Sequence, residues 1–158
     1  MVASTKSGLK TVAEVLAQAK ANPGKVTFAT PGLGHPFHFQ MEFLQEESGV
    51  KFLHVPYKGT GPALTELISG NVDVMFSSTH TIAPYITRGQ VRGVASLTRD
   101  RHRLIPDVPS YGELGLKLHS SGWFGFLAPS AVPAPILARL SSEIRAILVM
   151  PDVKASLE

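Results

Sequence analysis

Hydrophobic residues recur along the chain with two alternating periods. Between residues 12 and 21 they return every three or four positions, the spacing of one helical face, and Thr11 with Glu14 forms a capping box ahead of them. Residues 26–30 then form a short apolar run that is typical of a buried strand. The same succession of strand and helix repeats along the chain. The pattern predicts strands at 26–30, 52–57, 72–76 and 91–97. It predicts helices that begin after Thr11, at Pro36 and at Pro62, and a further helix to Arg88 that is capped by the hydroxyl-rich run 77–81.

This alternation of strands and helices predicts an α/β fold. Strands joined through helices need crossover connections, which favour a parallel sheet with helices on both faces. Ligands bind such sheets at the carboxyl ends of the strands. By sequence those ends are the segments 30–35, 57–61 and 77–81, which are rich in glycine, hydroxyl groups and basic residues. We therefore expect these three loops to converge on one edge of the sheet and to form the candidate site.

Size and composition restrict the class of protein. The 158 residues match one ordinary domain, and a content of 44% hydrophobic and 17% charged residues is that of a globular chain rather than a disordered one. No apolar run is long enough to cross a membrane, and the sequence shows no recognisable signal peptide. The net charge of +3 is not clustered on one basic segment, which argues against nucleic acid as a partner. Without cysteine the chain has neither a disulfide nor a thiol nucleophile.

The segment FATPGLGHPFHF, residues 28–39, carries the strongest signal for ligand binding. Gly32 and Gly34 lack a Cβ, so the chain can turn sharply there, with a positive φ at Gly34, and bring amide groups close to a ligand. Pro36 then starts a helix whose amino end carries partial positive charge, and the amides of residues 37–39 are candidate donors to a carboxylate. The alternative is that the glycines serve only a tight turn between strand and helix.

The histidines and serines near these loops allow two enzymatic interpretations. His35 and His38 lie three positions apart, a spacing that can place two metal ligands on one helical face. No third ligand lies nearby, so we expect no metal and no cofactor; His35 should cap the turn or contact the ligand, and His38 should be a hydrogen-bonded structural residue. Ser77 is a conceivable nucleophile, but neither an adjacent acidic residue nor a G-x-S-x-G motif accompanies it. Hydroxyls that cap a helix and bind a ligand are the simpler interpretation.

Four segments resemble, in order and spacing, a known receptor family. They are ANPGKVTFATPGLG, HVPYKGTGPALTELISGNVDVMF, PDVPSYGELGL and GWFGFLAPSAVPAPILARL, and together they extend over nearly the whole chain. They resemble the Bug-type extracytoplasmic solute receptors of the tripartite tricarboxylate transporter family. The resemblance implies a type II periplasmic-binding-protein fold whose two lobes close over a small carboxylate. It also implies delivery of that ligand to the membrane subunits of a transporter, a periplasmic location and no enzymatic activity.

The resemblance further implies a division of the chain. Residues 1–120 correspond to one ligand-binding lobe, and residues 121–158 to a return segment of the other lobe, most of which lies upstream in the family. Residues 136–148 carry a helical apolar stripe that we expect to pack in that other lobe. In this chain alone the stripe should instead form a homodimer or a helix-swapped dimer. Trp123 and Phe124 are expected in the core.

Two departures from the family pattern bear on the ligand. His35 and Pro36 stand where the family commonly has small hydroxylated residues, and Ser77 stands where some amino-acid-binding members have an aspartate. The missing acidic partner for an ammonium group favours a plain carboxylic acid. Two other classes stay open, namely a serine or metal-dependent hydrolase built on His35, His38 and Ser77, and the effector-binding module of a transcription regulator. The predicted ligand-binding residues are Thr30, Pro31, Gly32, Gly34, His35, Tyr57, Lys58, Gly59, Ser77, Ser78 and Thr79.

Overall fold

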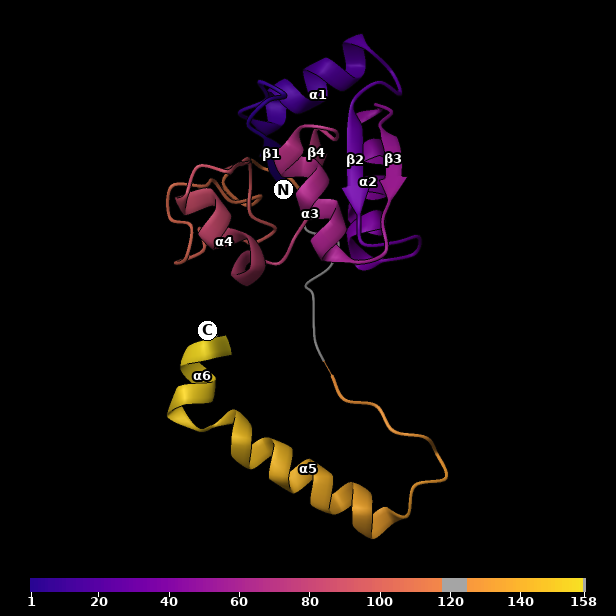
Figure 1. Ribbon diagram of the computed structural model, residues 1–158, viewed down its shortest axis with the longest axis vertical. Coiled ribbons are helices and arrows are strands. Elements are labelled where there is room, and N and C mark those ends of the chain that lie inside the picture. The colour runs from indigo at the N-terminus through magenta and orange to yellow at the C-terminus, as the bar shows by residue number, and fades with distance from the viewer. Residues whose placement is uncertain (118–124, 158) are drawn as a thin grey trace. The chain divides into compact units, whose positions relative to one another are not determined.

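The computed structural model describes residues 1–117 and 125–157. The chain divides into two compact units, residues 1–122 and 123–158 (Figure 1). The first unit contains a sheet with its helices, and the described part of the second consists of extended chain and helix. No helix among the described residues combines the length and the apolar character that crossing a membrane requires. The expected boundary at residue 120, and the residues Trp123 and Phe124, lie outside the described ranges.

A mixed sheet of five strands, in the order β3-β2-β4-β1-β5, forms the centre of the first unit within the described residues. The strands are β1 (Val2–Ser4), β2 (Thr27–Thr30), β3 (Leu53–Pro56), β4 (Val74–Met75) and β5 (Val91–Gly93). β2 pairs in parallel with β3 and β4, as predicted. The prediction of an all-parallel sheet is wrong at one strand, because β1 inserts antiparallel between β4 and β5. The sequence pattern does not reveal β1, since three residues are too few to show a period.

The helices lie where the caps and prolines of the sequence predict them, with one exception. They are α1 (Val12–Ala21), α2 (Pro36–Ser48), α3 (Thr60–Ser69) and α4 (Thr79–Thr87). The capping box of Thr11 and Glu14 is confirmed, and Gly49 ends α2 in the left-handed conformation. The exception is α3, which begins ahead of the predicted Pro62 because proline fits within a first helical turn. β4 and β5 are shorter than predicted, since flanking apolar residues such as Phe76 are buried in the core outside the regular ladder.

The pleat of β2 sends successive side chains into two separate cores. On one face Phe28 packs with residues of α1 and α2, and on the other face Ala29 packs with residues of α3 and α4. Figure 1 shows α3 in front of the sheet and α2 behind β2 and β3. Because helices cover both faces, the carboxyl ends of the parallel strands are the edge at which loops can form a site.

A hydrogen-bonded clamp fixes β2 against β4. Thr27 donates to Oδ2 of Asp73 from both its amide and its hydroxyl, each at 2.8 Å. The amide of Asp73 donates in return to the hydroxyl oxygen of Thr27 at 2.9 Å. Since the clamp holds the amino-terminal ends of the two strands in register, it also fixes the relation of the loops that leave their carboxyl ends.

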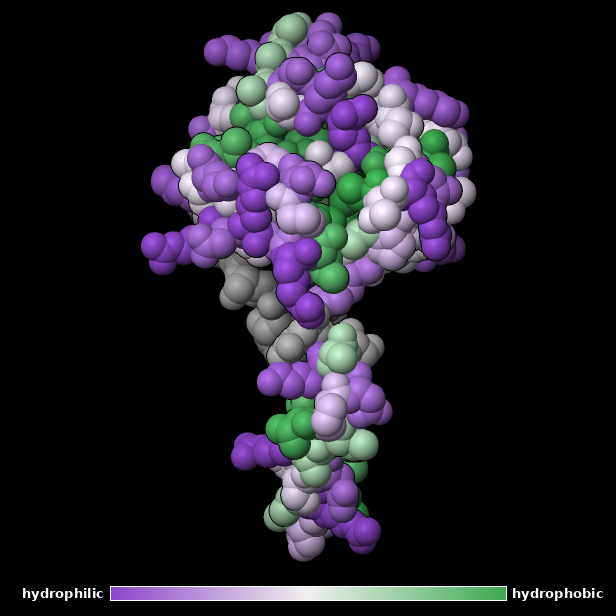
Figure 2. Space-filling model, turned by 90° about the vertical axis from the view of Figure 1, so that its left-hand side faces the viewer, coloured by the Kyte–Doolittle hydropathy of each residue, from purple (hydrophilic) through white to green (hydrophobic). Residues whose placement is uncertain are grey.

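The second unit presents apolar side chains that its own residues do not bury. Its helices are α5 (Ala134–Leu148) and α6 (Pro151–Leu157). No residue of α5 is buried, and Figure 2 shows hydrophobic residues in green on the surface of this unit. The exposed large apolar residues of α5 are Ile136, Leu137, Leu140, Ile147 and Leu148. The predicted amphipathic helix is thus present, and what covers its apolar face stays a prediction.

Candidate functional site

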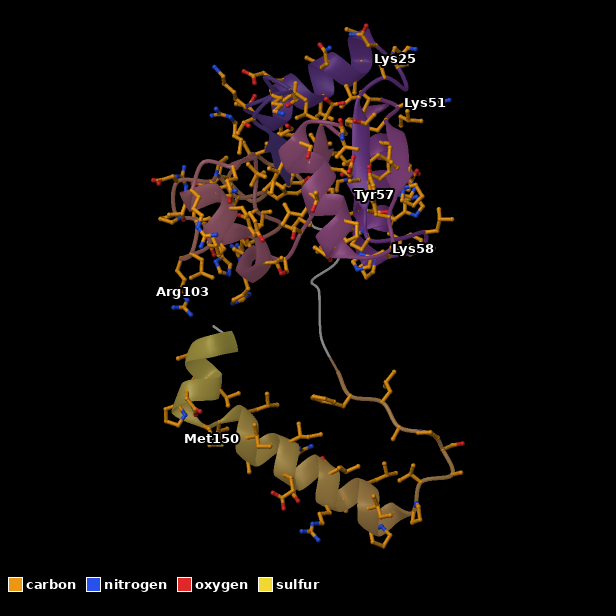
Figure 3. All side chains as sticks on the ribbon, in the orientation of Figure 1. Lys25, Lys51, Tyr57, Lys58, Arg103 and Met150 are labelled. Atoms are coloured by element: carbon orange, nitrogen blue, oxygen red, sulfur yellow. The ribbon has the colours of Figure 1, made fainter. Side chains whose placement is uncertain are left out.

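The carboxyl ends of β2, β3 and β4 meet at one edge of the sheet, as predicted. β2 lies between the other two strands and runs parallel to both, so the segments 30–35, 57–61 and 77–81 leave the sheet at the same edge. Figure 3 shows Tyr57 and Lys58 near the tips of the β2 and β3 arrows. The structure therefore brings the three predicted segments into one neighbourhood.

Backbone hydrogen bonds join the loop after β2 to the loop after β3. The amide of Tyr57 donates to the carbonyl of Thr30 at 2.9 Å. The amide of Gly59 donates to the carbonyl of Pro31, also at 2.9 Å. A Cβ on Gly32 would lie 3.7 Å from the carbonyl oxygen of Tyr57, which is an ordinary contact. The two loops are therefore one connected surface rather than two independent turns.

Gly34 turns the chain near the tip of the loop after β2. Its φ is +72°, which confirms the predicted left-handed conformation. A Cβ at this position would meet nothing within 4 Å. Glycine is therefore favoured here by the backbone conformation and not by a lack of space. Leu33, its neighbour, is 76% exposed and projects from the protein at the tip.

The start of α2 is closed by the loop itself, which corrects one expectation. Nδ1 of His35 accepts a hydrogen bond from the amide of Phe37 at 3.2 Å. The carbonyl of His35 accepts from the amides of His38, at 2.8 Å, and Phe39, at 3.4 Å. The amides of residues 37–39 are thus occupied and are not open donors to a carboxylate. The expectation that His35 caps the turn is confirmed, and burial lowers the pKa of this histidine, which favours the neutral ring that capping requires.

The start of α3 is open. Its N-cap is Gly59, which has no side chain to accept a hydrogen bond from the first turn. Within the described residues the amides of Thr60 and Gly61 have no hydrogen-bond partner, and the same holds for the amides of Gly32 and Leu33 in the neighbouring loop. The amino end of a helix attracts anions through such free amides. In the sequence, the run from Gly59 to Gly61 could have indicated this open helix start. The prediction missed it because it began the helix at Pro62.

The segment after β4 contributes hydroxyl groups. Ser78 is the N-cap of α4, where its Oγ accepts from the amide of Thr81 at 3.4 Å and lies 2.7 Å from the Thr81 hydroxyl. Oγ of Ser77 is buried and has no partner among the described residues. Thr79 occupies the first turn of α4 and is half-buried. The cap that the sequence predicts at this segment is confirmed, and the Ser77 hydroxyl retains its full hydrogen-bonding capacity.

The predicted site residues Thr30 and Tyr57 are buried to different degrees. Thr30 is fully buried, and its hydroxyl donates to the carbonyl of Gly32 at 3.1 Å and lies 2.6 Å from Nε2 of His54. It therefore supports the loop from within. Tyr57 is half-buried, and burial, followed by the charge of Glu66, raises the pKa of its phenol. Tyr57 is consequently a neutral group at the carboxyl edge of the sheet.

The geometry does not assemble the residues of the alternative hydrolase. His35 directs Nδ1 to the amide of Phe37, and His38 directs Nδ1 to the amide of Gly34 at 3.3 Å. Neither ring contacts the Ser77 hydroxyl, which has no partner in the described chain. The described residues also contain no group of three histidine, aspartate or glutamate side chains placed to hold a metal ion. His38 is hydrogen-bonded, as the structural interpretation of that residue predicts.

Comparisons with known proteins agree with this architecture. Residues 1–158 match the family described as the tripartite tricarboxylate transporter family receptor. The BugT protein of Bordetella pertussis is 34% identical over 149 residues, which cover 94% of this chain and 46% of BugT. A protein encoded between tcbD and tcbE in Pseudomonas sp. strain P51 is 34% identical over 160 residues, covering 100% of this chain and 48% of that protein.

Solved structures share the fold over nearly the whole chain. The periplasmic binding protein BugD is 31% identical with a TM-score of 0.90, and the match covers 99% of this chain and 52% of BugD. MatC from Rhodopseudomonas palustris with bound malate is 29% identical with a TM-score of 0.90, covering 99% of this chain and 53% of MatC. The chain therefore spans about half the length of the relatives that it matches. Because the family match runs from the first residue to the last, this chain belongs to the receptors of the tripartite tricarboxylate transporter family.

Proposed function

We propose that the chain forms one side of a periplasmic receptor site for a small carboxylate, at the carboxyl edge of β2, β3 and β4. The observation that carries the proposal is the pair of open amide sets, Gly32 with Leu33 and Thr60 with Gly61, on two loops that hydrogen bonds hold together. Lys58 lies between them in sequence and adds positive charge at the same edge. Free amides at a helix start and a nearby ammonium group are the chemistry that binds a carboxylate.

The relatives support the class of ligand. MatC is described with bound malate, and another R. palustris protein of the same fold, 25% identical with a TM-score of 0.90, with adipate. In this chain Ser77 offers a hydroxyl at the third loop and no negative charge, so the site has no partner there for a substrate ammonium group. We therefore propose a plain carboxylic acid rather than an amino acid, delivered to the membrane subunits of a tripartite transporter.

A ligand bound only at the carboxyl edge of this sheet would stay mostly in water. The proposed receptor therefore includes a second lobe that closes over the ligand. The proposal assigns residues 1–120 to one lobe and residues 121–158 to a segment of the other. The exposed apolar face of α5 is the surface that would pack within that second lobe.

The exposed apolar face of α5 should also make the purified chain self-associate. Large apolar patches are rarely left exposed on monomers, so we propose that two copies pair their α5 faces or exchange these helices. Light scattering on the purified chain tests this proposal, with Leu140→Asp as the variant that should restore a monomer. A monodisperse monomer of the unmodified chain contradicts it.

Titration calorimetry tests the proposed function. We expect malate and adipate to bind more tightly than their dimethyl esters by about 1 to 3 kcal/mol, the contribution of charge-assisted hydrogen bonds. The esters are matched controls because they keep the carbon skeleton and remove the charge. Equal affinities for acid and ester contradict an anion site at this edge.

A further inference from the structure

Two histidine rings lie stacked next to the loop after β2. His38 of α2 and His54 of β3 have ring centroids 4.0 Å apart and planes inclined by 18°. His54 stacks in turn on Phe28 of β2, with centroids 4.5 Å apart and planes inclined by 14°. Phe28 and His54 are register partners of the parallel β2–β3 pair, which places their rings on the same face of the sheet. Three elements therefore contribute to one stack of rings.

Both imidazoles are hydrogen-bonded to the loop that we propose binds the carboxylate. The amide of Gly34 donates to Nδ1 of His38 at 3.3 Å. Nε2 of His54 lies 2.6 Å from the hydroxyl of Thr30, and this hydroxyl donates to the carbonyl of Gly32 at 3.1 Å. Each glycine of the loop is thus connected to one ring of the pair.

These hydrogen bonds determine where the imidazole protons lie. His38 accepts from an amide at Nδ1, so the proton of the neutral ring is on Nε2, which lies 3.4 Å from Oε1 of Glu42. The hydroxyl of Thr30 has one proton, and when it donates that proton to the carbonyl of Gly32, Nε2–H of His54 is the donor in the His54–Thr30 contact. A second proton on His38 would occupy Nδ1 and remove the acceptor of the loop amide.

We propose that His38 and His54 are positioning residues that hold the loop after β2 in its ligand-binding conformation while both rings are neutral, and that protonation of His38 releases Gly34 and weakens carboxylate binding. This inference rests on the proposed function above. It goes beyond that function because the affinity for the carboxylate then depends on the protonation state of His38, which need not touch the ligand.

The surroundings of His54 favour its neutral ring. Within the described residues the titratable groups recorded against His54 are His38 and Glu42, and the third ring of the stack, Phe28, is apolar. Burial, followed by repulsion from His38, lowers the pKa of His54, and the carboxylate of Glu42 acts in the opposite direction. Two positive rings with centroids 4.0 Å apart would repel each other, so the pair accepts at most one proton readily.

Three variants separate the positioning role from a merely structural one. His38→Asn keeps an acceptor near the place of Nδ1 but does not titrate. His38→Phe keeps an aromatic ring in the stack and removes the acceptor. His102→Asn is the matched control, because His102 also accepts an amide hydrogen bond at Nδ1, from Leu104, but belongs to another loop.

The experiment combines two readouts on the same protein. Without ligand, the amide resonance of Gly34 is followed by NMR from pH 8 to pH 5, together with the ring resonances of His38. The affinity for malate is measured by calorimetry at pH 8 and pH 6. Both values lie well above a carboxyl pKa of about 4, so the ligand is ionised in both measurements. We expect the Gly34 amide to shift with the titration of His38, and the affinity for malate to fall about threefold to tenfold at pH 6, the net effect of one hydrogen bond.

The variants extend this expectation. His38→Asn should bind malate equally at both pH values, His38→Phe should bind about threefold to tenfold more weakly at both, and His102→Asn should behave as the unmodified protein. A Gly34 resonance that does not follow His38, or a His38→Asn protein that keeps the pH dependence, overturns the inference. If neither malate nor adipate binds at any pH while the Gly34 amide still follows His38, the proposed function is overturned and the coupling of the histidine to the loop is supported.

Discussion

The helices α2 and α3 start at the same edge of the same sheet, but their first turns are satisfied in different ways. At α2 the ring and carbonyl of His35 accept hydrogen bonds from the first amides. At α3 the N-cap is Gly59, and the amides of Thr60 and Gly61 have no partner in the described chain. A capped start contributes to helix stability, whereas an open start keeps its capacity to bind an anion. Of these two helix starts, only that of α3 has first-turn amides free to donate to the proposed ligand.

The first prediction concerns a substitution that disrupts the open start of α3. Gly59 has φ +109° and ψ 172°, a region that almost only glycine adopts, so Gly59→Ala should cost about 1 to 3 kcal/mol and displace the first turn of α3. We expect carboxylate affinity to fall by about tenfold or more, measured by calorimetry. Gly49→Ala is the control, because Gly49 has φ +64° at the far end of α2. It should lower the unfolding temperature with unchanged affinity, and an equal loss of affinity in both variants would contradict the assignment.

The second prediction concerns the tip of the loop between β2 and α2. Gly34→Val places a β-branched residue at φ +72°, where the strain is about 1 to 2 kcal/mol, although a Cβ meets nothing within 4 Å. Affinity should fall about fivefold to tenfold while thermal unfolding stays cooperative. Gly24→Val, at φ +70° and equally free of contacts, should carry the same strain without the loss of affinity. Normal binding by the Gly34 variant would exclude a role for the loop conformation.

The third prediction sharpens the electrostatic side of the open start. Lys58 is exposed, and exposed charges contribute about 0.2 to 1 kcal/mol, so Lys58→Gln should weaken malate binding about twofold to fivefold. The difference should shrink at high salt because exposed charges are screened. Calorimetry at low and high ionic strength checks both statements, with Lys51→Gln, ahead of the amino end of β3, as a control of equal charge change. An unchanged salt dependence would remove Lys58 from the site.

The fourth prediction tests the capped start and has the smallest expected effect. Burial lowers the pKa of His35, so the unfolded chain binds a proton more readily than the folded one. This contribution to stability is therefore complete above the ordinary histidine pKa of about 6.5 and decreases as the pH falls below it. Thermal unfolding at pH 7.5 and 5.5 measures the decrease, which should be smaller in His35→Asn because asparagine caps without titrating. An equal decrease in the variant would place its origin elsewhere.

Much of the fold follows from local signals in the sequence. The capping box at Thr11, Pro36 at the first position of α2 and the left-handed Gly49 each depend on a few neighbouring residues, so they are predictable and are confirmed. The convergence of the three loops follows from the alternation of strands and helices alone. β1 escaped prediction because its place between β4 and β5 depends on partners far along the chain.

The candidate site was predictable at the level of segments but not at the level of atoms. Gly59 was among the expected residues, yet the open amides of Thr60 and Gly61 follow only once the true start of α3 is known. The stacking of His38 on His54 joins residues of two different elements, and no spacing in the sequence encodes it. Which hydroxyl or ring accepts which proton is decided by tertiary contacts.

The position of β1 between β4 and β5 has a consequence for how the chain folds. Val2 pairs with Met75 and Ser4 with Val91, so the sheet is complete only after most of the first unit has found its place. Such contacts between distant parts of a sequence slow folding, whereas β2, β3 and β4 are closer to one another in sequence and can assemble earlier. Until β1 docks, the facing edges of β4 and β5 offer unpaired backbone groups to other chains. We therefore expect the refolding yield of this protein to fall with rising protein concentration, and a peptide with the sequence of residues 1–8 to compete for the open edge during refolding.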